Sequence, residues 1–577
     1  MTEMTDDSYE SHRPISAMSS NPSLKPKNES LLGVFYGIGM NVNNVIGSGI
    51  VTAPGIVWNS VKSPVIVLLL WLIGGIISMA GSLTYVELGI IHKISGGETK
   101  YLQTAYPNPK FLMSYLFSFM FVLLIRPGLL CAVLQAGAQY FWFTLKGYRF
   151  DNDIQQDTIG WNLPFSPFWF IKFLAIILLF IITLYHMISN RWANIINQGL
   201  AIIKIITYSI IALAGFYRLC QNSETSSTNW KKMLVGSTDI TNYSSSILLI
   251  MFSYNGWNNL NYSLDEFRDP ERKLILSNSI SVGIVTAMYL LVNVAFISVV
   301  PGADILNNSK IDETIGAEFF SQLFGGNDTI ARIFTALIVL SVMGTAAVDV
   351  WSGSRVIVAA AKSDFFPKYS YQLRTWHHYF NTPVNALFAQ FVWCTFIILF
   401  IGGSFTISSF SLFATFSMYS YWIFYFATGI GLLLIRKRNN NNLKKMQFEK
   451  SDEELNKNKD NNNINGHELL SQLEKKFFTV PLPVAGIFIL AGFFILIFSF
   501  VVHVDCPVGN PDCGEEVLKQ KRVSKLSPLF ISYGFLFVGL LFWYFFYYWW
   551  DAKKKQKEAN IMRIPAENNE ENSLDFN

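Results

Sequence analysis

Charged residues are scarce in this chain. Asp, Glu, Lys and Arg make up 15% of its 577 residues, whereas soluble proteins carry about a quarter. The formal net charge is only +4, and the basic residues are scattered, so we expect no nucleic-acid partner. Histidine and cysteine are rare as well, with 7 and 5 residues, and no group of them has metal-ligand spacing. We therefore expect neither a metal nor another cofactor.

Apolar residues take the place of the missing charges. They account for 51% of the chain, aromatic residues account for 15%, and the mean hydropathy is +0.32. This composition is typical of a polytopic membrane protein in a lipid bilayer. The apolar stretches contain no HExxH motif, no Ser/His constellation and no paired aspartates, so we do not expect an enzyme.

Twelve apolar stretches are long enough to cross a bilayer as a helix, which takes about 20 residues. The sequence therefore predicts an all-α protein with twelve transmembrane helices. We place these stretches at 32–56, 63–92, 111–143, 167–188, 194–217, 243–264, 277–300, 329–361, 384–403, 406–435, 480–504 and 528–550.

The remaining segments are polar. We predict cytosolic tails at 1–30 and 551–577, a core of ten helices over 31–435, a linker over 436–476 and helices 11 and 12 within 477–550. The first tail has no signal-peptide pattern, so we expect the first span to act as its own insertion signal. The linker is rich in Lys, Asn and Glu, and such a composition favours disorder.

The basic residues of the connections predict the orientation in the membrane. With the N-terminus inside, cytosolic segments hold 28 of the 44 Lys and Arg residues, external loops hold 10, and the other 6 lie within spans. An excess of Lys and Arg on the cytosolic side is the general rule. We therefore predict that both termini are cytosolic.

The first predicted span is interrupted at residues 45–55, where three glycines and a proline fall within an apolar run. An unpaired backbone amide in lipid costs several kcal/mol, so a break in a helix persists only where it lines a protected cavity. The amides freed at the start of the second half-helix favour a small anion. The alternative is a kinked helix with small residues at a packing face.

A second interruption falls in span six. Residues 255–262 contain four asparagines and a glycine, and polar residues at membrane depth are costly and usually functional. Breaks in spans one and six, five helices apart, indicate two inverted repeats of five helices with a binding site between them.

Several polar residues lie inside other spans. Lys204 sits in the middle of span five, where a lysine must pair, lose its proton or extend to the interface. Thr345 and Asp349 are four residues apart in span eight and share one helix face. Asp349 either pairs with Lys204 or caps a neighbouring helix or faces a vestibule. Arg126 either extends outward or lines the permeation path, and we interpret Glu98 as structural, with gating as the alternative.

The chain resembles the amino acid–polyamine–organocation (APC) transporters, in particular the L-type amino acid transporter branch and the fungal methionine permeases. The resemblance covers residues 31–435 well and the last two spans only in topology. It rests on segments 47–50 (GSGI), 81–89 (GSLTYVELG) with 95–98 (SGGE), 252–262 (FSYNGWNNLNY) with 269–272 (DPER), and 354–355 (SR) with 362–367 (KSDFFP). It implies an APC fold of the LeuT type.

The resemblance also implies roles for individual residues. The substrate carboxylate would bind the amides of Ser48 and Gly49 with help from the Ser48 hydroxyl, and the ammonium would bind carbonyls of Val45, Phe252 and Asn255. The Phe252 ring would cover the substrate, and Asn258 would lie near its side chain. Lys204 corresponds to a position that sodium occupies in related transporters, so Lys204 either couples transport or is purely structural. Thr345 and Asp349 would take part in coupling, although Asp349 departs from the family, whose members usually carry small or hydroxyl residues there.

Together, these expectations predict the function of the protein. We expect an amino acid permease that imports neutral L-amino acids, methionine or another large apolar one, by proton symport and alternating access. The alternatives are an L-type exchanger or uniporter, and a receptor that binds amino acids without moving them. No matched position places an ionisable residue in the side-chain pocket, so lysine and glutamate should be poor substrates.

The resemblance also bears on partners and location. Animal relatives join a heavy chain through a cysteine in the loop after span three, and residues 144–166 contain no cysteine. We therefore expect no disulfide-linked heavy chain. We expect the protein to reside in the plasma membrane.

Overall fold

The computed structural model describes most of the chain, with gaps at connections and at both ends. The described ranges are 34–92, 96–147, 167–221, 223–231, 236–262, 264, 270–307, 312–325, 328–362, 369–401, 409–457, 478–501 and 515–549.

The described residues form helices and no strands. Eight of these helices are long and apolar enough to cross a membrane. One of the eight, residues Leu112–Lys146, joins α5 (Leu112–Met120) to α6 (Arg126–Lys146) through the π-helical turn Phe121–Ile125. The other seven are α3 (Pro64–His92), α7 (Pro167–Ile188), α8 (Asn190–Cys220), α11 (Pro270–Val299), α14 (Asp328–Lys362), α17 (Ser409–Lys457) and α20 (Glu515–Trp543).

Shorter helices occupy the other predicted stretches, so each of the twelve contains a helix. Three of them are single apolar helices: α10 (Ile240–Ser253), α16 (Val384–Phe400) and α19 (Leu482–Phe498). The first stretch is divided between α1 (Val34–Val45) and α2 (Gly49–Val61). The number of spans and the inverted repeat remain predictions. Connecting segments form α4 (Gly97–Ala105), α9 (Glu224–Lys231), α12 (Gly302–Asn307), α13 (Ile315–Leu323), α15 (Ser370–Arg374) and short turns.

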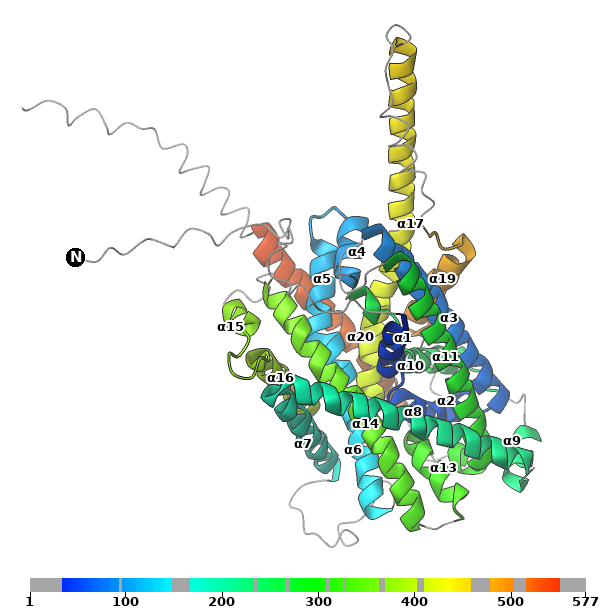
Figure 1. Cartoon of the computed structure of the whole chain (residues 1–577). Helices are drawn as coiled ribbons and strands as arrows, with labels where there is room; N and C mark the ends of the chain where they lie inside the picture. Colours follow the sequence, from blue (N-terminus) through cyan, green and yellow to red (C-terminus); the bar gives the residue numbers. More distant parts are fainter. Residues whose placement is uncertain are drawn as a thin grey trace, which may run out of the picture.

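The broken first span lies inside the bundle. Helix α2 packs on α10, α1 packs on α11, and α14 packs on both α6 and α8; Figure 1 shows α1, α2 and α10 surrounded by longer helices. Apolar side chains on the outer helices are exposed, among them Ile202, Leu213 and Phe537. Such a surface suits contact with lipid rather than water.

Helix α17 enters the segment predicted as a linker, which stays a prediction over residues 436–476. Helix α17 continues past residue 435 through the first half of the predicted linker and ends at Lys457; Figure 1 shows this extension, in yellow, projecting beyond the bundle. A helix already nucleated inside the membrane is extended at little cost, and Lys, Glu and Gln are good helix formers. Residues 458–477 and the whole of both predicted tails lie outside the described residues.

Candidate functional site

The break in span one separates α1 from α2 by three residues, Ile46, Gly47 and Ser48. In the described part of the chain, the amides of residues 48–50 donate no hydrogen bond, whereas the Gly47 backbone hydrogen-bonds the Tyr289 hydroxyl. Ser48 is 1% exposed, and its hydroxyl has no partner among the described residues. Three amides and one hydroxyl are therefore available to an anionic group at the start of α2.

Buried tyrosines stabilise the carbonyl groups of both breaks. The Tyr289 hydroxyl of α11 lies 2.9 Å from the Val45 oxygen and 2.7 Å from the Ser253 oxygen. Since a hydroxyl has one proton, the two carbonyls share it, and each keeps acceptor capacity for another donor. The Tyr208 hydroxyl donates to the Gly47 oxygen at 3.1 Å. These hydrogen bonds from tyrosine hydroxyls stabilise the unwound backbone through its carbonyl groups.

The break in span six begins where α10 ends at Ser253, and the chain resumes as the 3-10 turn Asn259–Tyr262. Gly256 lies between them with φ at +112°, and a Cβ there would lie 2.1 Å from the Asn44 amide nitrogen. Only glycine fits both the backbone angle and the contact. The two breaks are therefore in direct contact at this position.

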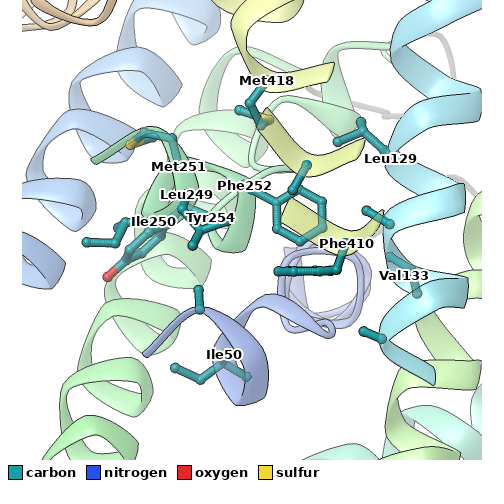
Figure 2. Close-up of a cluster of buried hydrophobic side chains, with 14 of the residues drawn as sticks. Ile50, Leu129, Val133, Leu249, Ile250, Met251, Phe252, Tyr254, Phe410 and Met418 are labelled. Atoms are coloured by element: carbon teal, nitrogen blue, oxygen red, sulfur yellow. The ribbon is translucent and has the colours of Figure 1, made fainter. Parts of the chain in front are cut away.

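A cavity lies between the breaks, with about 500 Å³ of space not filled by atoms, open solvent included. One wall is apolar. Figure 2 shows the Phe252 and Phe410 rings facing Leu129 and Val133 of α6, and the two rings pack edge-on with centroids 5.5 Å apart. The other residues around the cavity are Asn44, Val45, Gly47, Ser48, Gly49, Arg126, Ser253, Asn255, Gly256, Asn259, Thr345, Asp349 and Tyr421.

Five of the six residues expected to bind substrate line this cavity: Val45, Ser48, Gly49, Phe252 and Asn255. Asn258 does not. Its amide nitrogen donates to the Glu98 carboxylate at 2.7 Å and to the Tyr421 hydroxyl at 2.9 Å. Its neighbour Asn259 lines the cavity instead, because the chain turns as a 3-10 helix at this point.

Glu98 is the centre of a buried hydrogen-bonded cluster next to the cavity. Its carboxylate accepts hydrogen bonds from Asn258, from the Tyr421 hydroxyl at 3.2 Å and from the Tyr262 hydroxyl. The described residues supply it with no ion-pair partner. Burial raises the pKa of Glu98, although the hydrogen bonds from Tyr262 and Asn258 act in the opposite direction. Tyr421 also lines the cavity, so this glutamate is connected to the site as well as to the packing around it.

Lys204 is fully buried beside the break in span one. Its ammonium donates to the Asn43 backbone oxygen at 2.9 Å, to the Asn43 side chain at 3.2 Å and to the Thr345 hydroxyl at 3.0 Å. The Thr345 hydroxyl in turn lies 3.4 Å from the Ile46 oxygen. Lys204 therefore connects α8, α14 and the unwound end of α1.

Asp349 does not pair with Lys204. It forms an ion pair with Arg126, whose Nη1 lies 3.1 Å from the Asp349 Oδ1. The three acceptors from Asn43 and Thr345 already satisfy the Lys204 ammonium, so this lysine needs no carboxylate. Both members of the Arg126–Asp349 pair line the cavity. Two ionisable side chains that the resemblance did not assign to substrate binding therefore line the cavity.

Two broken helices that contact each other around a small cavity define an architecture used by secondary transporters. A family model described as amino acid permease matches residues 32–512. The chain therefore belongs to the amino acid permease family, as the resemblance predicted, and its relatives are integral membrane transporters rather than enzymes.

Curated relatives agree with this family. The chain is 27% identical over 425 residues to the human b(0,+)-type amino acid transporter 1, an alignment that covers 72% of this chain and 78% of the relative. It is 24% identical over 377 residues to the high-affinity methionine permease of Saccharomyces cerevisiae, covering 64% and 61%. It is 25% identical over 411 residues to the human large neutral amino acids transporter small subunit 2, covering 70% and 69%.

We expect Gly49→Val to abolish substrate binding. A Cβ on Gly49 would lie 2.6 Å from the Ser253 Cα, so α2 would be forced away from α10 and the amides of the break would shift. Uptake and a ligand-induced rise in Tm would measure the loss. Gly39→Ala is the control, because a Cβ there meets nothing within 4 Å. Normal affinity in a folded Gly49→Val protein would contradict this site.

The Glu98 cluster predicts a pH dependence of stability. Because the pKa of Glu98 is raised in the fold, folded protein binds this proton more tightly than unfolded protein does. The free energy of unfolding should fall as pH rises from the ordinary value of about 4.3 through the raised pKa. Glu98→Gln should flatten this slope in Tm measured against pH, while Lys100→Gln on the same helix should keep it. Identical slopes in wild type and Glu98→Gln would contradict the assignment.

Proposed function

We propose that this permease imports neutral L-amino acids, methionine or another large apolar one, by proton symport across the plasma membrane with both termini cytosolic. The observation that carries the proposal is the group of amides at residues 48–50 that donate no hydrogen bond within the described part of the chain, together with the Ser48 hydroxyl that has no partner there, beside the cavity. A carboxylate is the anionic group common to all amino acids, and these donors suit it.

The ammonium group would bind on the carbonyl side of the same site. The Val45 oxygen keeps acceptor capacity beside the shared Tyr289 proton, and Phe252 and Asn255 line the cavity nearby. An ammonium has three donors and needs several oxygens in a site without bulk water. The side chain would then extend along the apolar wall of Leu129, Val133 and Phe252, which favours a large apolar substrate.

Alternating access would move one group of helices against the other around this site. The edge-on packing of Phe252 on Phe410 supports a role for the Phe252 ring as a cover, since the two rings belong to separate helices, α10 and α17. Separation of these helices would uncover the cavity.

The coupling step would depend on Lys204. Its ammonium contacts the break through Asn43 and contacts α14 through Thr345, so its protonation and the position of α1 are linked. Loss of the proton removes one of the three donors and turns the nitrogen into an acceptor, which weakens this set of contacts. Exchange without protons is the alternative mechanism, and a receptor that binds without transport is another.

No disulfide-linked heavy chain is part of the proposal. The segment 144–166 after the third span has no cysteine, so we propose that the chain works without a covalent partner. Recovery of a disulfide-linked complex from the native membrane would contradict this. Uptake of labelled methionine by the purified full chain in liposomes tests the function itself, and binding without uptake would support the receptor.

Lys204→Ala should abolish concentrative, pH-dependent uptake and leave exchange partly active, because alanine lacks the amine that would bind and release the transported proton. Lys204→Arg should not restore coupling, since a guanidinium stays protonated. Lys172→Ala is the control, because Lys172 is another intramembrane lysine that bonds the Leu399 oxygen, away from both breaks. If Lys204→Ala concentrates methionine with the wild-type pH profile, the lysine is structural.

Selectivity among neutral substrates should be low, and selectivity against charged ones high. A misfit of one methylene costs about 1–3 kcal/mol, whereas an unpaired buried charge costs several kcal/mol. Leucine and phenylalanine should therefore inhibit methionine uptake at concentrations close to methionine's own, and lysine and glutamate only at far higher ones. Arginine uptake as fast as methionine uptake would contradict a neutral pocket.

A further inference from the structure

Two opposite charges face each other at one side of the cavity. Arg126 begins α6 and Asp349 lies on α14, and their side chains are 13% and 12% exposed. Both line the cavity, together with Asn259 from the break in span six. The pair therefore borders the space in which the substrate side chain would lie.

The guanidinium group of Arg126 is only partly engaged. Its Nη1 donates to Asp349, its Nη2 lies 3.5 Å from the Asn259 side-chain oxygen, and its Nε has no partner among the residues that the structure describes. The Phe121 ring packs against it with 5.4 Å between the guanidinium carbon and the ring centroid. Arg126 is thus positioned by its neighbours and keeps donor capacity.

The Arg126–Asp349 pair keeps the side-chain end of the cavity neutral by compensation, although the cavity contains ionisable groups. A buried ion pair with both members present is tolerated, but removal of one member leaves an uncompensated charge that is strongly destabilising. A charged substrate side chain that competes for one member exposes the other to this cost. A neutral side chain leaves the pair intact.

We propose that Arg126 and Asp349 form a charge filter that restricts the permease to substrates with neutral side chains. The proposal rests on the proposed function, because it takes the cavity to be the amino acid site. Two consequences distinguish the filter from a structural ion pair. Without the Asp349 charge, Arg126 becomes a partner for acidic side chains, and without the Arg126 charge, Asp349 becomes a partner for cationic ones.

The test is competition against labelled methionine uptake by the purified full chain in liposomes, with lysine, glutamate and leucine as competitors. Wild type should be inhibited by leucine and only weakly by lysine or glutamate. Asp349→Asn should be inhibited by glutamate, and Arg126→Gln by lysine, each at concentrations at least about tenfold lower than wild type requires, the factor that 1.4 kcal/mol produces.

Two further variants separate the filter from effects on folding. Asn259→Asp keeps the ion pair and adds a negative charge at the atom that lies 3.5 Å from Arg126, so it should raise the potency of lysine alone. The double variant Arg126→Gln with Asp349→Asn has no charge at either position and should reject lysine and glutamate as wild type does.

Arg355→Gln is the matched control. Arg355 is a second arginine on the intramembrane helices, and it stacks on Trp351 and bonds Asn190, outside the cavity. Its removal changes the net charge by the same amount as Arg126→Gln. We expect Arg355→Gln to keep the wild-type pattern of competition.

The outcomes distinguish this proposal from the proposed function. If wild type and the variants take up methionine and the variants keep the wild-type response to lysine and glutamate, the filter is refuted while the permease function stands. If the single variants do not fold, an unchanged lysine response in Asn259→Asp refutes the filter. If wild type takes up no neutral amino acid, the proposed function fails and the filter fails with it.

Discussion

The structure depends on a constraint of the bilayer: each backbone group released by a broken helix must find a partner or face a protected cavity. Tyr289 meets this requirement for both breaks at once, because its hydroxyl reaches the Val45 and Ser253 oxygens. Tyr208 does the same for Gly47. Each of these carbonyls keeps acceptor capacity, and within the described part of the chain the amides of residues 48–50 donate no hydrogen bond. We propose that these donors bind the anionic group of the substrate, while the Val45 oxygen keeps acceptor capacity for its ammonium.

The same constraint accounts for the close approach of the two breaks. Gly49 allows α2 to approach the Ser253 backbone of α10, and Gly256 allows the break in span six to approach Asn44. Neither position has room for a Cβ, so the glycines serve close packing between the breaks as well as flexibility. Small residues at a packing face and an opened backbone are alternatives at the level of sequence, and the structure contains both.

The breaks and their approximate neighbours could be predicted from the sequence, because clusters of Gly, Pro and Asn inside apolar runs are typical of helices that open around a site. The direction of individual side chains could not. Asn258 and Asn259 are adjacent and chemically identical, yet one contacts Glu98 and the other lines the cavity. The partner of Asp349 is a residue 223 positions away in the chain, and no local pattern relates the two. The extension of α17 into the linker could not be predicted either. The composition of the linker indicates disorder, but it does not show that a helix already formed in the membrane can continue into this segment.

Helix α14 brings the polar features of the site together. Thr345 contacts Lys204 and the Ile46 oxygen, and Asp349, one turn further along, contacts Arg126 of α6. The contacts to the unwound first span and the contacts to the side-chain end of the cavity therefore belong to one rigid element. A displacement of α14 relative to α1 or α6 changes both sets of contacts together, because one turn of helix cannot move independently of the next. The proton carrier that we propose and the charge filter that we propose would thus be coupled through the backbone of α14, without any direct bond between Lys204 and Asp349.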